Sequence, residues 1–566
     1  MSAYQSIQED GDSAKKIAVP QDREESSHSG IRHINPSPVT STATSDLEQR
    51  PLLDREHDHE YLDPDNPIVS PLNLRDVRLL KVGVTVLIII NSILVFLLTL
   101  TDFISIPGLN NRGKSFLDLD LILISLFSNA VTLWCFTVPV YYERIIGYVT
   151  AGLLLLDFFV ILLVPYMRSQ FGFIGSLFLV WTGLNILLDS FVDYWVETSK
   201  QKQEIKYTGR IEKRRTVGEM FVALTKIVVK LFLIWVVWCI SLTLWLQSFD
   251  SHEKPWGKLV SVGDDQFKVH LACFGDVHNT TGEAEKKQPI VLVEGGQLTS
   301  SEAFQEWVEE LHSLNKLDRY CIWDRPGYGF SDSAPSPVSV GIIADYLVQA
   351  LEKEKIEGPF SLVAFDVGGL YSRMVASKIP GKIHSLLLVD SWHEDLLKKW
   401  PFSGSNRKNE STHVFKNILE LMNNRTGLKL WFKGLISPLG IISNIHWFFH
   451  PRKHSSKSRI FGSDMYYQPK YVRARLQEQV TSAILSYGEV KNADIHDLPL
   501  SVISSDFMIK NSLNWGKWQR EITKLSSNTI EWVIAENSDH FIWKSPKGRE
   551  QLQQLLLRLV SDKSNY

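Results

Sequence analysis

Apolar and polar positions divide the chain into three stretches. Residues 1–74 are rich in Ser, Asp, Glu, His and Pro and show no apolar period, residues 75–250 contain long apolar runs, and residues 251–566 alternate short apolar runs with mixed segments. A segment without an apolar period cannot bury enough surface to offset the entropy lost on ordering. We therefore predict a disordered N-terminal tail, a membrane region and a soluble region, in that order.

Five apolar runs in the middle stretch are long enough to cross a bilayer. A hydrocarbon core of about 30 Å needs roughly 20 apolar residues as helix. Runs of this length lie at about 82–101, 121–142, 145–167, 171–191 and 231–247. This pattern predicts an all-α transmembrane bundle of about five helices. Asp157 and Asp189 fall inside two of the runs, which indicates a polar interior face, a helix-packing contact or a protonated carboxyl.

Basic residues gather on one side of a five-span arrangement. They precede the first run, separate the second from the third, and precede the fifth, at Arg75, Arg78, Lys81, Arg144, Lys200, Lys202, Lys206, Arg210, Lys213, Arg214, Arg215, Lys226 and Lys230. Because basic loops stay in the cytosol, we predict a cytosolic N-terminus and a soluble region on the opposite side. The first run begins too far into the chain for a cleavable signal and is expected to act as an uncleaved anchor. One span more or fewer would reverse this placement.

Short motifs bear on the cellular address. Glu48-Gln49-Arg50-Pro51-Leu52-Leu53 resembles an acidic dileucine signal for traffic to the vacuole or lysosome. Acceptor sequences for N-glycosylation occur at Asn279, Asn409 and Asn424, all in the soluble region. Both observations agree with an endomembrane protein whose soluble region faces a lumen, and the region is a possible glycoprotein.

Strand and helix patterns alternate in the soluble stretch. Continuous apolar runs such as "PIVLVEGG" (289–296) and "FSLVAFD" (360–366) are typical of strands buried on both faces of a parallel sheet. Helical patterns at about 301–314 and 339–354 lie between them, which predicts an α/β fold. The alternation stops at about 395–490, where we predict a lid. The apolar segment 428–451 within it could line a pocket, rest against the bilayer or pack on the core.

Charge and cysteine content exclude some functions. The net charge of −3 gives no reason to expect nucleic acid as a partner. Cys135 and Cys239 lie in apolar runs, Cys273 and Cys321 lie on predicted strands, and no Cys/His spacing indicates a metal site. We therefore predict buried structural thiols and expect neither a metal nor a cofactor.

Four motifs carry the candidate chemistry. "LVAFDVGGLYSRM" (362–374) has the outline of a strand-to-helix nucleophile elbow with Asp366 in the place of the usual serine. "WDRPGYGFSD" (323–332) precedes it, and "LLLVDSWHED" (386–395) and "AENSDHFI" (535–542) follow it. In this order the motifs resemble the α/β-hydrolase superfamily over about 255–566. The resemblance implies a mostly parallel eight-stranded sheet with a helical lid.

The same resemblance implies the partners of Asp366. His540, after the last strand, falls where the superfamily carries its catalytic base. The acid that orients this histidine is expected at Asp506, after the seventh strand, or at Asp390, at the end of the sixth. Glu394 and Asp395 are further alternatives.

Backbone groups complete the expected site. The N–H of Val367, together with that of Gly296 or Gln297, would form an oxyanion hole. We interpret Asp324 and Arg325 as structural residues that hold the turn near the oxyanion strand.

An aspartate in the nucleophile position changes the chemistry. A carboxylate is already ionised at neutral pH and can displace a leaving group at carbon. Asp366 therefore resembles the nucleophile of epoxide hydrolases and haloalkane dehalogenases. The resemblance is incomplete, because Val367 replaces their usual Trp and Glu294-Gly295-Gly296 replaces their His-Gly. The lid tyrosines that would activate an epoxide could come from Tyr466, Tyr467, Tyr471 and Tyr487.

Three functional hypotheses follow. The first is a membrane-anchored hydrolase of a small apolar or lipid-like substrate, acting through Asp366 and His540. The second is an inactive hydrolase-fold module that binds or scaffolds, and the third is a transporter-like role motivated by Asp157 and Asp189. The expected partners are the bilayer and an apolar small molecule. The whole architecture also resembles fungal integral membrane proteins with a C-terminal hydrolase region, some of them mitochondrial, so the organelle stays open between vacuole or endomembrane and mitochondrion.

Overall fold

The structure of the chain is a computed structural model. It describes residues 62, 67–109, 112, 114, 116–211, 216–278, 288–398 and 425–561. The residues from 61 onward belong to one compact unit. Nearly all of the predicted tail, the dileucine-like motif and the sequons at Asn279, Asn409 and Asn424 lie outside the described residues.

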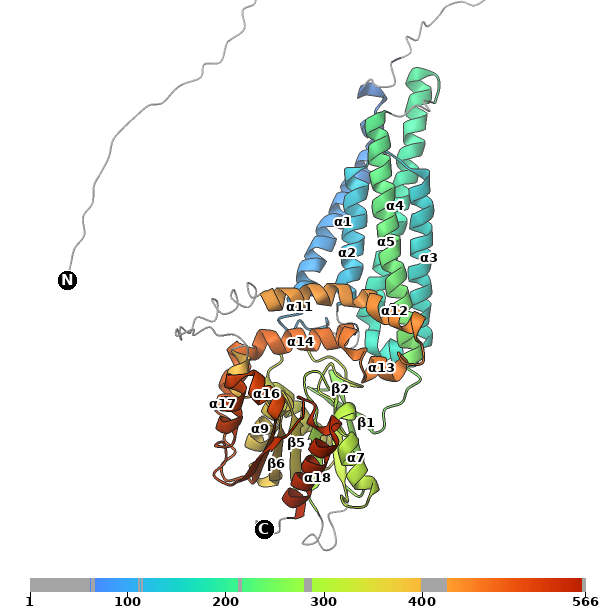
Figure 1. Cartoon of the computed structure of the whole chain (residues 1–566). Helices are drawn as coiled ribbons and strands as arrows, with labels where there is room; N and C mark the ends of the chain where they lie inside the picture. The colour runs from blue at the N-terminus through green and yellow to red at the C-terminus, as the bar shows by residue number, and fades with distance from the viewer. Residues whose placement is uncertain are drawn as a thin grey trace, which may run out of the picture. The chain divides into compact units, whose positions relative to one another are not determined.

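Five helices among the described residues are long and apolar enough to cross a membrane (Figure 1). They are α1 (Arg75–Leu100), α2 (Leu117–Trp134), α3 (Tyr141–Leu163), α4 (Pro165–Thr208) and α5 (Val217–Asp250). Each overlaps one of the predicted runs. Helix α4 turns at Gly172, whose φ of 62° glycine adopts without steric cost. Its 44 residues are far more than the roughly 20 that a bilayer core requires.

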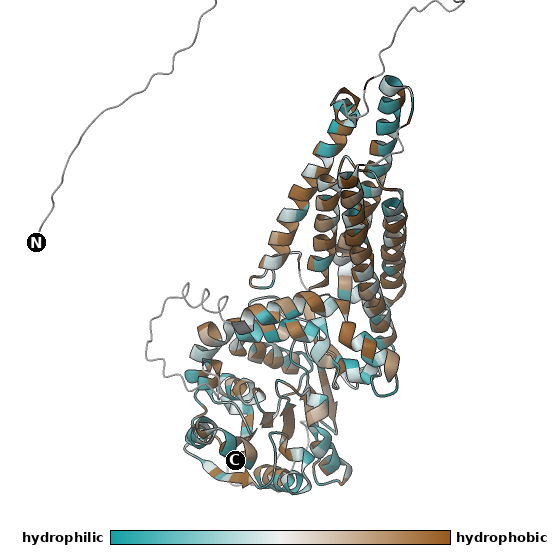
Figure 2. Cartoon of the chain, turned by 45° about the horizontal axis from the view of Figure 1, so that its top comes forward, coloured by the Kyte–Doolittle hydropathy of each residue, from teal (hydrophilic) through white to brown (hydrophobic). Residues whose placement is uncertain are grey.

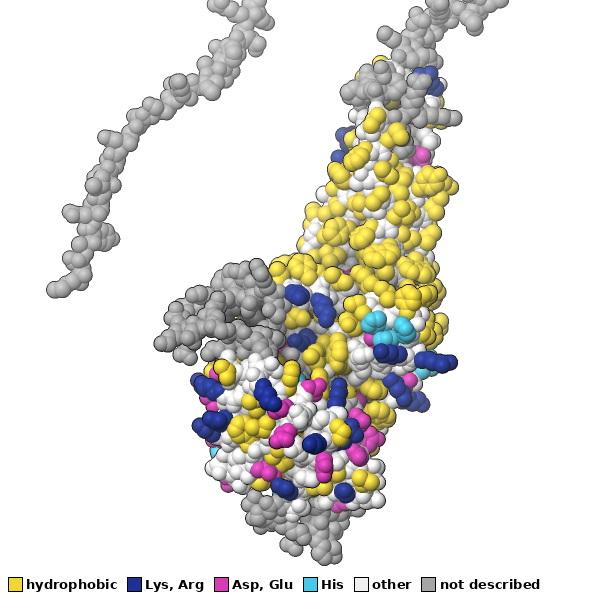
Figure 3. Space-filling view, in the orientation of Figure 1, with side chains coloured by type: hydrophobic (Ala, Val, Ile, Leu, Met, Phe, Trp, Pro, Cys, Tyr) yellow, Lys and Arg dark blue, Asp and Glu magenta, His cyan; other side chains and the backbone are white. Residues whose placement is uncertain are grey.

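The helices of the bundle are largely hydrophobic (Figure 2), its visible surface is apolar (Figure 3), and several polar side chains lie among the apolar ones inside it. Phe96, Trp134 and Leu163 are exposed, and the space-filling view shows hydrophobic side chains covering the bundle. Asn91 and Asn129, both buried, donate to the Asn185 amide oxygen at 3.1 and 2.8 Å. Such internal pairing is what a lipid environment requires, because lipid tails offer no partner to a polar side chain.

A buried ionic cluster joins three of these helices. The Lys226 ammonium lies 2.5 Å from Glu143 and 2.6 Å from Asp193, and the Lys230 ammonium lies 3.4 Å from both Glu143 and Asp189. Lys226 and Lys230 were predicted to precede the fifth span, and this prediction is wrong. Both lie within α5, where their side chains are almost completely buried and pair with carboxylates of the bundle.

Asp157 and Asp189 occupy helix-packing contacts. Asp157 accepts hydrogen bonds from the Ser241 hydroxyl at 2.6 Å and the Trp245 indole at 3.0 Å. Asp189 is contacted by the hydroxyl of Ser128 in addition to the Lys230 ion pair. Of the alternatives raised for these two carboxylates, the packing contact is the one that the described contacts support.

An eight-stranded sheet forms the centre of the soluble region. Its strands are β1 (Lys258–Val262), β2 (Phe267–Phe274), β3 (Ile290–Glu294), β4 (Tyr320–Trp323), β5 (Phe360–Phe365), β6 (Ile383–Val389), β7 (Leu500–Ser505) and β8 (Thr529–Ala535). They lie in the order β1-β2-β4-β3-β5-β6-β7-β8. Strand β2 is antiparallel to β1 and β4, and every other pair is parallel. The structure confirms the predicted α/β-hydrolase fold class.

Helices cover both faces of the sheet (Figure 1). Residues from α8 (Val340–Lys353) and α9 (Gly368–Lys378) pack on one face, where Leu386 and Leu388 of β6 point. Residues from α7 (Glu306–Ser313) and α18 (Pro546–Ser561) pack on the other, where Leu387 and Val389 point. Successive strand residues point to opposite faces, so two apolar layers explain the continuous apolar runs of the sequence.

The described part of the lid packs against the membrane helices. It contains α11 (Arg425–Ile436), α12 (Ile441–Phe449), α13 (Ser456–Ile460), α14 (Pro469–Thr481) and α15 (Tyr487–Lys491). Trp431 and Leu435 of α11 pack on the apolar core of the bundle, and Arg473 of α14 pairs with Asp102, after α1, at 2.6 Å. Phe432 and Phe448 stay exposed. The apolar lid segment therefore uses part of its surface to contact the bundle and leaves part uncovered.

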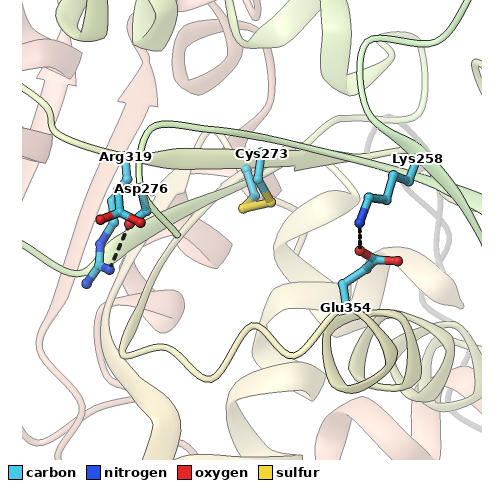
Figure 4. The surroundings of a disulfide bond; sticks show 6 residues. Lys258, Cys273, Asp276, Arg319 and Glu354 are labelled. Atoms are coloured by element: carbon cyan, nitrogen blue, oxygen red, sulfur yellow. Dashed lines mark hydrogen bonds and ion pairs between the residues drawn. A yellow bond between two sulfur atoms is a disulfide. The ribbon is translucent and has the colours of Figure 1, made fainter. Parts of the chain in front are cut away.

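A disulfide links Cys273 on β2 to Cys321 on β4 (Figure 4). The two residues are direct partners in the antiparallel register, which brings their Cα atoms to 4.0 Å. The prediction of four buried thiols is therefore wrong for this pair, because the sequence does not reveal which strands are neighbours. Cys135 and Cys239 remain free and buried.

We predict that peptide mapping of the full-length protein, alkylated without reductant, yields one linked pair of peptides containing Cys273 and Cys321. The cross-strand pairing holds the two sulfur atoms together, and an oxidising compartment preserves such a bond. Cys135 and Cys239 serve as internal controls that take up the alkylating reagent after denaturation. Alkyl label on Cys273 and Cys321 would contradict the assignment.

Candidate active site

Asp366 stands on a sharp turn between β5 and α9. Its φ of 56° lies in the left-handed region, which costs energy for a residue with a side chain and is typical of functional turns. The turn is possible because its neighbours are small. A Cβ on Gly368 would lie 2.5 Å from the Gly295 carbonyl oxygen, and one on Gly369 would overlap the Ser391 hydroxyl. The local sequence thus raises the Asp366 side chain above the end of the sheet.

Both carboxylate oxygens of Asp366 have partners. Oδ2 accepts the backbone N–H of Gln297 at 2.8 Å, the Val367 N–H also donates to the carboxylate, and Oδ1 lies 3.3 Å from His540 Nε2. Burial alone would raise the pKa of Asp366. The hydrogen bond and charge of His540 and the two backbone N–H groups outweigh burial and hold this pKa below its usual value. Asp366 is therefore a carboxylate in the resting site.

His540 lies between two carboxylates. Its Nδ1 is 2.7 Å from Asp390 Oδ2, and its ring packs on Phe365 with centroids 4.6 Å apart. Burial opposes protonation, but the hydrogen bonds and charges of Asp366 and Asp390 raise the pKa of His540 to about 10. The resting site at neutral pH is an imidazolium held by two carboxylates.

Asp390 is the acid that orients His540. It is fully buried, and its Oδ1 accepts the Ser505 N–H at 3.1 Å and the Trp515 indole N–H at 2.8 Å. Burial raises the pKa of Asp390, and the contacts of His540 oppose this rise. The supporting role of Trp515 was missed, because this residue belongs to α17 (Leu513–Ile522) and to no motif.

Asp506, the other candidate acid, does not contact the imidazole in the structure. Its Oδ1 accepts the Ser538 N–H at 3.1 Å and its Oδ2 accepts the Lys510 ammonium at 2.8 Å. The physical reason is local: β7 ends at Ser505, and Asp506 already begins α16 (Asp506–Asn511). Asp506 therefore fixes the loop that carries His540. Glu394 pairs with Arg373 at 2.9 Å instead.

Arg325 fixes the loop after β3, where the oxyanion hole is predicted. Its guanidinium donates to the carbonyl oxygens of Gly295 at 2.6 Å and Gly296 at 2.7 Å, and it pairs with Glu294 at 2.6 Å. Burial raises the pKa of Glu294 to about 7, although Arg325 opposes this shift. Gly296 contributes its carbonyl and its lack of a side chain, since a Cβ there would lie 2.9 Å from the Asp366 Cβ. Of the predicted donors, Gln297 and Val367 contact Asp366.

Two lid tyrosines lie against the same loop. The Tyr471 hydroxyl donates to the Gln297 carbonyl oxygen at 2.8 Å, and the Tyr466 hydroxyl donates to that of Leu298. Tyr467 and Tyr487 contact the ammonium groups of lysines instead. Tyr466 and Tyr471 therefore support the oxyanion loop from the lid side.

A cavity of about 180 Å³ lies beside Tyr471. Its walls include Tyr166 and Phe171 of α4, Phe330 after β4, and Met465 and Tyr471 of the lid. Tyr471 thus borders the cavity and contacts the residue whose N–H binds Asp366. The walls also carry charged side chains, among them Asp250, Glu253 and Lys470, and neither Asp366 nor His540 lines this cavity.

Asp324 lies in one of two groups of possible metal ligands in the described part of the chain. His270, Glu302 and Asp324 form one group, and His446, His454 and Asp464 form the other. Neither contains Asp366 or His540. Asp324 also accepts the Phe330 N–H at 3.0 Å, which agrees with its predicted role in the turn.

Comparisons with known proteins match both halves of the chain. Residues 47–273 match a region of unknown function (DUF2417), and residues 288–411 match the α/β-hydrolase fold. An uncharacterised vacuolar membrane protein of Saccharomyces cerevisiae is 30% identical over 561 residues, covering 84% of this chain and 86% of the relative. An uncharacterised protein of Schizosaccharomyces pombe is 26% identical over 511 residues, covering 84% and 89%.

Solved structures resemble the soluble region. An esterase from Exiguobacterium antarcticum is 15% identical with a TM-score of 0.35 and covers 54% of this chain and 100% of its own. A putative lipase from Acinetobacter baumannii is 19% identical with a TM-score of 0.35 and covers 56% and 96%.

The ion pairs of His540 predict a pH-dependent stability. Because the pKa of folded His540, about 10, lies above its usual value of about 6.5, protonated His540 stabilises the fold fully below about pH 6.5. This stabilisation is lost as the pH rises through about 10. His540→Gln should lower the stability near pH 6.5 by about 3 kcal/mol or more, since two buried carboxylates lose their counterion.

Thermal unfolding of the detergent-solubilised protein measures this effect. The difference in Tm between wild type and His540→Gln should shrink between pH 6.5 and pH 10. The matched control is His312→Gln, because His312 contacts the Leu317 carbonyl oxygen rather than a carboxylate. A difference that stays constant with pH would contradict the ionic account of His540.

Proposed function

This chain belongs to the family of the uncharacterised Saccharomyces cerevisiae vacuolar membrane protein. We propose that it is a membrane-anchored hydrolase with Asp366 as its nucleophile. The observation that carries the proposal is the arrangement of one imidazole between Asp366 and Asp390, with two backbone N–H groups on Asp366. These are the parts that covalent catalysis by a carboxylate requires.

The first step is a substitution at carbon. Asp366 Oδ1 forms a bond to an electrophilic carbon of the substrate, and the carbon–oxygen bond of an epoxide or the carbon–halogen bond of a halide breaks, its electron pair leaving with that atom. The product is an alkyl ester of Asp366. The orientation of the carboxylate supports attack by Oδ1, because the Gln297 N–H holds Oδ2 while Oδ1 lies on the side of His540.

The second step is hydrolysis of that ester. Esterification removes the charge of Asp366, one of the two groups that raise the pKa of His540, so the imidazolium gives up its proton more easily. This proton goes to the alkoxide formed by epoxide opening, or to solvent when the leaving group is a halide. Neutral His540, oriented by Asp390, takes a proton from water, and the water oxygen attacks Cγ of Asp366. Negative charge then develops on Oδ2, where the N–H groups of Gln297 and Val367 stabilise it. The bond from Cγ to the former Oδ1 breaks as protonated His540 gives its proton to the departing oxygen, and the product alcohol carries that oxygen away. The regenerated Asp366 carboxyl group then passes its proton to His540, which restores the ion pair.

The substrate proposed for this site is apolar. The cavity beside Tyr471 is bordered by aromatic and aliphatic side chains of α4 and the lid. The lid also exposes Phe432, Phe448 and Phe449 near the membrane helices. An apolar molecule dissolved in a bilayer would partition onto such surfaces. The hydroxyl groups of Tyr466 and Tyr471 donate to loop carbonyls in the resting state and would have to be released to donate to an epoxide oxygen.

The proposed subcellular location is the vacuolar membrane or another endomembrane, with the soluble region in the lumen. The name of the Saccharomyces cerevisiae relative supports the membrane. The five candidate spanning helices among the described residues, the predicted cytosolic N-terminus and the Cys273–Cys321 disulfide support the lumenal side. An odd number of spans separates the two ends, and disulfides persist in oxidising compartments.

One observation favours a second candidate, an inactive binding module. Asp366 is saturated by two backbone N–H groups and an imidazolium, which also describes a stable structural ion pair. The two candidates differ in what Asp366→Asn does. In an enzyme it removes turnover, and in a binding module it leaves ligand affinity and cellular role nearly intact.

We predict that two variants of the solubilised protein both lose turnover but differ in whether the covalent intermediate accumulates. Asp366→Asn should lower turnover of long-chain epoxides or haloalkanes by at least about 10³-fold and abolish the covalent intermediate. His540→Gln should lower turnover similarly but accumulate the alkyl ester, because only the second step needs the imidazole. Intact-protein mass spectrometry detects the added mass.

The control for this experiment is Asp497→Asn, an exposed carboxylate outside the site, which should leave turnover unchanged. Turnover of esters alone, retained by Asp366→Asn, would exclude the carboxylate mechanism. Absence of any turnover across epoxide, haloalkane and ester panels would favour the binding module.

We also predict that the C-terminus is protected from protease added to sealed vacuolar vesicles and becomes sensitive when detergent is added. A tag at the N-terminus should be digested in both conditions, because an odd number of spans places the two ends on opposite sides. Digestion of a C-terminal tag without detergent would overturn the lumenal placement.

A further inference from the structure

The lid contains a second cluster of chemically active side chains, with His446 on α12, His454 between α12 and α13, and Asp464 after α13. His446 Nδ1 lies 3.0 Å from Asp464 Oδ1, and His454 Nδ1 lies 2.6 Å from Asp464 Oδ2. The two imidazole rings are 4.4 Å apart between centroids. Two imidazoles therefore present the same ring nitrogen to the two oxygens of one carboxylate.

The three side chains differ in how far they are buried, which distinguishes this group from an ion pair on the open surface. The Asp464 side chain is 1% exposed and that of His454 12%, whereas that of His446 is 37% exposed. The carboxylate is thus fixed on the inside, and one imidazole borders solvent. The Ser458 hydroxyl donates to Asp464 Oδ2 at 3.0 Å, which orients the carboxylate from behind, as outer-shell groups do in metal sites.

We propose that His446, His454 and Asp464 bind a divalent transition-metal ion of the Zn²⁺ class. Two imidazole nitrogens and a carboxylate oxygen are a ligand set that this class prefers. In a tetrahedral zinc site with bonds of about 2.0–2.1 Å, neighbouring ligand atoms lie about 3.3 Å apart. The three candidate ligand atoms lie within 4.8 Å of one another. The separations of 3.0 and 2.6 Å run to different oxygens of Asp464, so the side chains have to shift for one ion to reach all three ligand atoms. The ion would replace the protons that the two Nδ1 atoms carry when the imidazoles donate to Asp464.

The fourth ligand is water or His450. His450 lies between the other two histidines in sequence, is exposed, and has its ring centroid 6.4 Å from that of His454. Its position at the solvent side leaves it able to rotate toward the ion. Figure 3 shows histidine side chains gathered beside Lys and Arg on this face. The nearby Arg459 is neutralised by Asp250 of α5, at 3.0 and 3.1 Å.

The ion would tie the lid to the membrane helices. Arg459 of α13 donates to the His454 carbonyl oxygen at 2.9 Å while it pairs with Asp250. The turn between α12 and α14 therefore carries both the proposed ligands and the contact to α5. Closing that turn with an ion would hold α13 against the bundle. This role is independent of the chemistry proposed for Asp366.

The other group of possible metal ligands, formed by His270, Glu302 and Asp324, is closed to solvent. Burial opposes protonation of His270, but the hydrogen bonds and charges of Asp324 and Glu302 raise its pKa to about 9. A protonated imidazole donates to carboxylates and does not bind a metal. That group is an internal ion pair, whereas the lid group is open to solvent at His446.

Titration of the full-length protein tests the site. Detergent-solubilised protein is stripped with a chelator and titrated with Co²⁺, whose visible absorption reports coordination, followed by competition with Zn²⁺. We expect one equivalent of ion per chain. His454→Ala and Asp464→Asn should each weaken Co²⁺ binding by at least tenfold. The matched control is His496→Ala, because His496 pairs with Asp494 at 3.1 Å on the exposed surface without a second imidazole.

A second readout separates ion binding from misfolding. Zn²⁺ should raise the Tm of stripped wild type and of His496→Ala but not that of Asp464→Asn, which preserves the shape of the side chain. Wild type that binds no stoichiometric Co²⁺ overturns the proposal, whatever the variants do. Equal loss of binding in His496→Ala and His454→Ala would also overturn it, because the ion would then be held elsewhere.

Discussion

The ion pairs of one imidazolium with two buried carboxylates are the interaction on which the site depends. Removing three charges from water is costly, and a buried charge persists only when it is paired and hydrogen-bonded. Here Asp366 and Asp390 both sit on left-handed backbone, with φ of 56° and 41°, at the ends of adjacent parallel strands. The sheet places the two carboxylates, and the loop after β8 inserts His540 between them. The contacts of His540 with both carboxylates hold the two residues in these backbone conformations.

The membrane helices take part in shaping this site. Arg473 and Arg459 of the lid pair with Asp102 and Asp250 at the ends of α1 and α5, so the position of the lid is coupled to the bundle. Tyr471, on the same helix as Arg473, contacts the loop whose N–H binds Asp366. A continuous path of contacts therefore runs from the bundle to Asp366. The cavity bordered by α4 and the lid meets this path at Tyr471.

The sequence predicted the elements whose signal is local and failed where the answer depends on spatial neighbours. Apolar runs and the elbow around Asp366 sufficed for the sheet and for the strand-to-helix turn that carries Asp366. The choice between Asp506 and Asp390 could not be made, because it depends on which carboxyl faces the imidazole. The disulfide required knowing that β2 and β4 are adjacent, which neither cysteine reveals. Lys226 resembled a loop residue in the sequence, yet its carboxylate partners lie on α3 and α4.

The central claim is that an oxygen of Asp366 forms a bond to the substrate, and isotope incorporation tests it most directly. A single turnover in heavy-oxygen water, followed by proteolysis and mass spectrometry of the peptide that contains residue 366, locates the label. The account predicts one heavy oxygen in Asp366, because water attacks Cγ of the ester and the original oxygen leaves with the product. Label found only in the product, with residue 366 unlabelled, would contradict it.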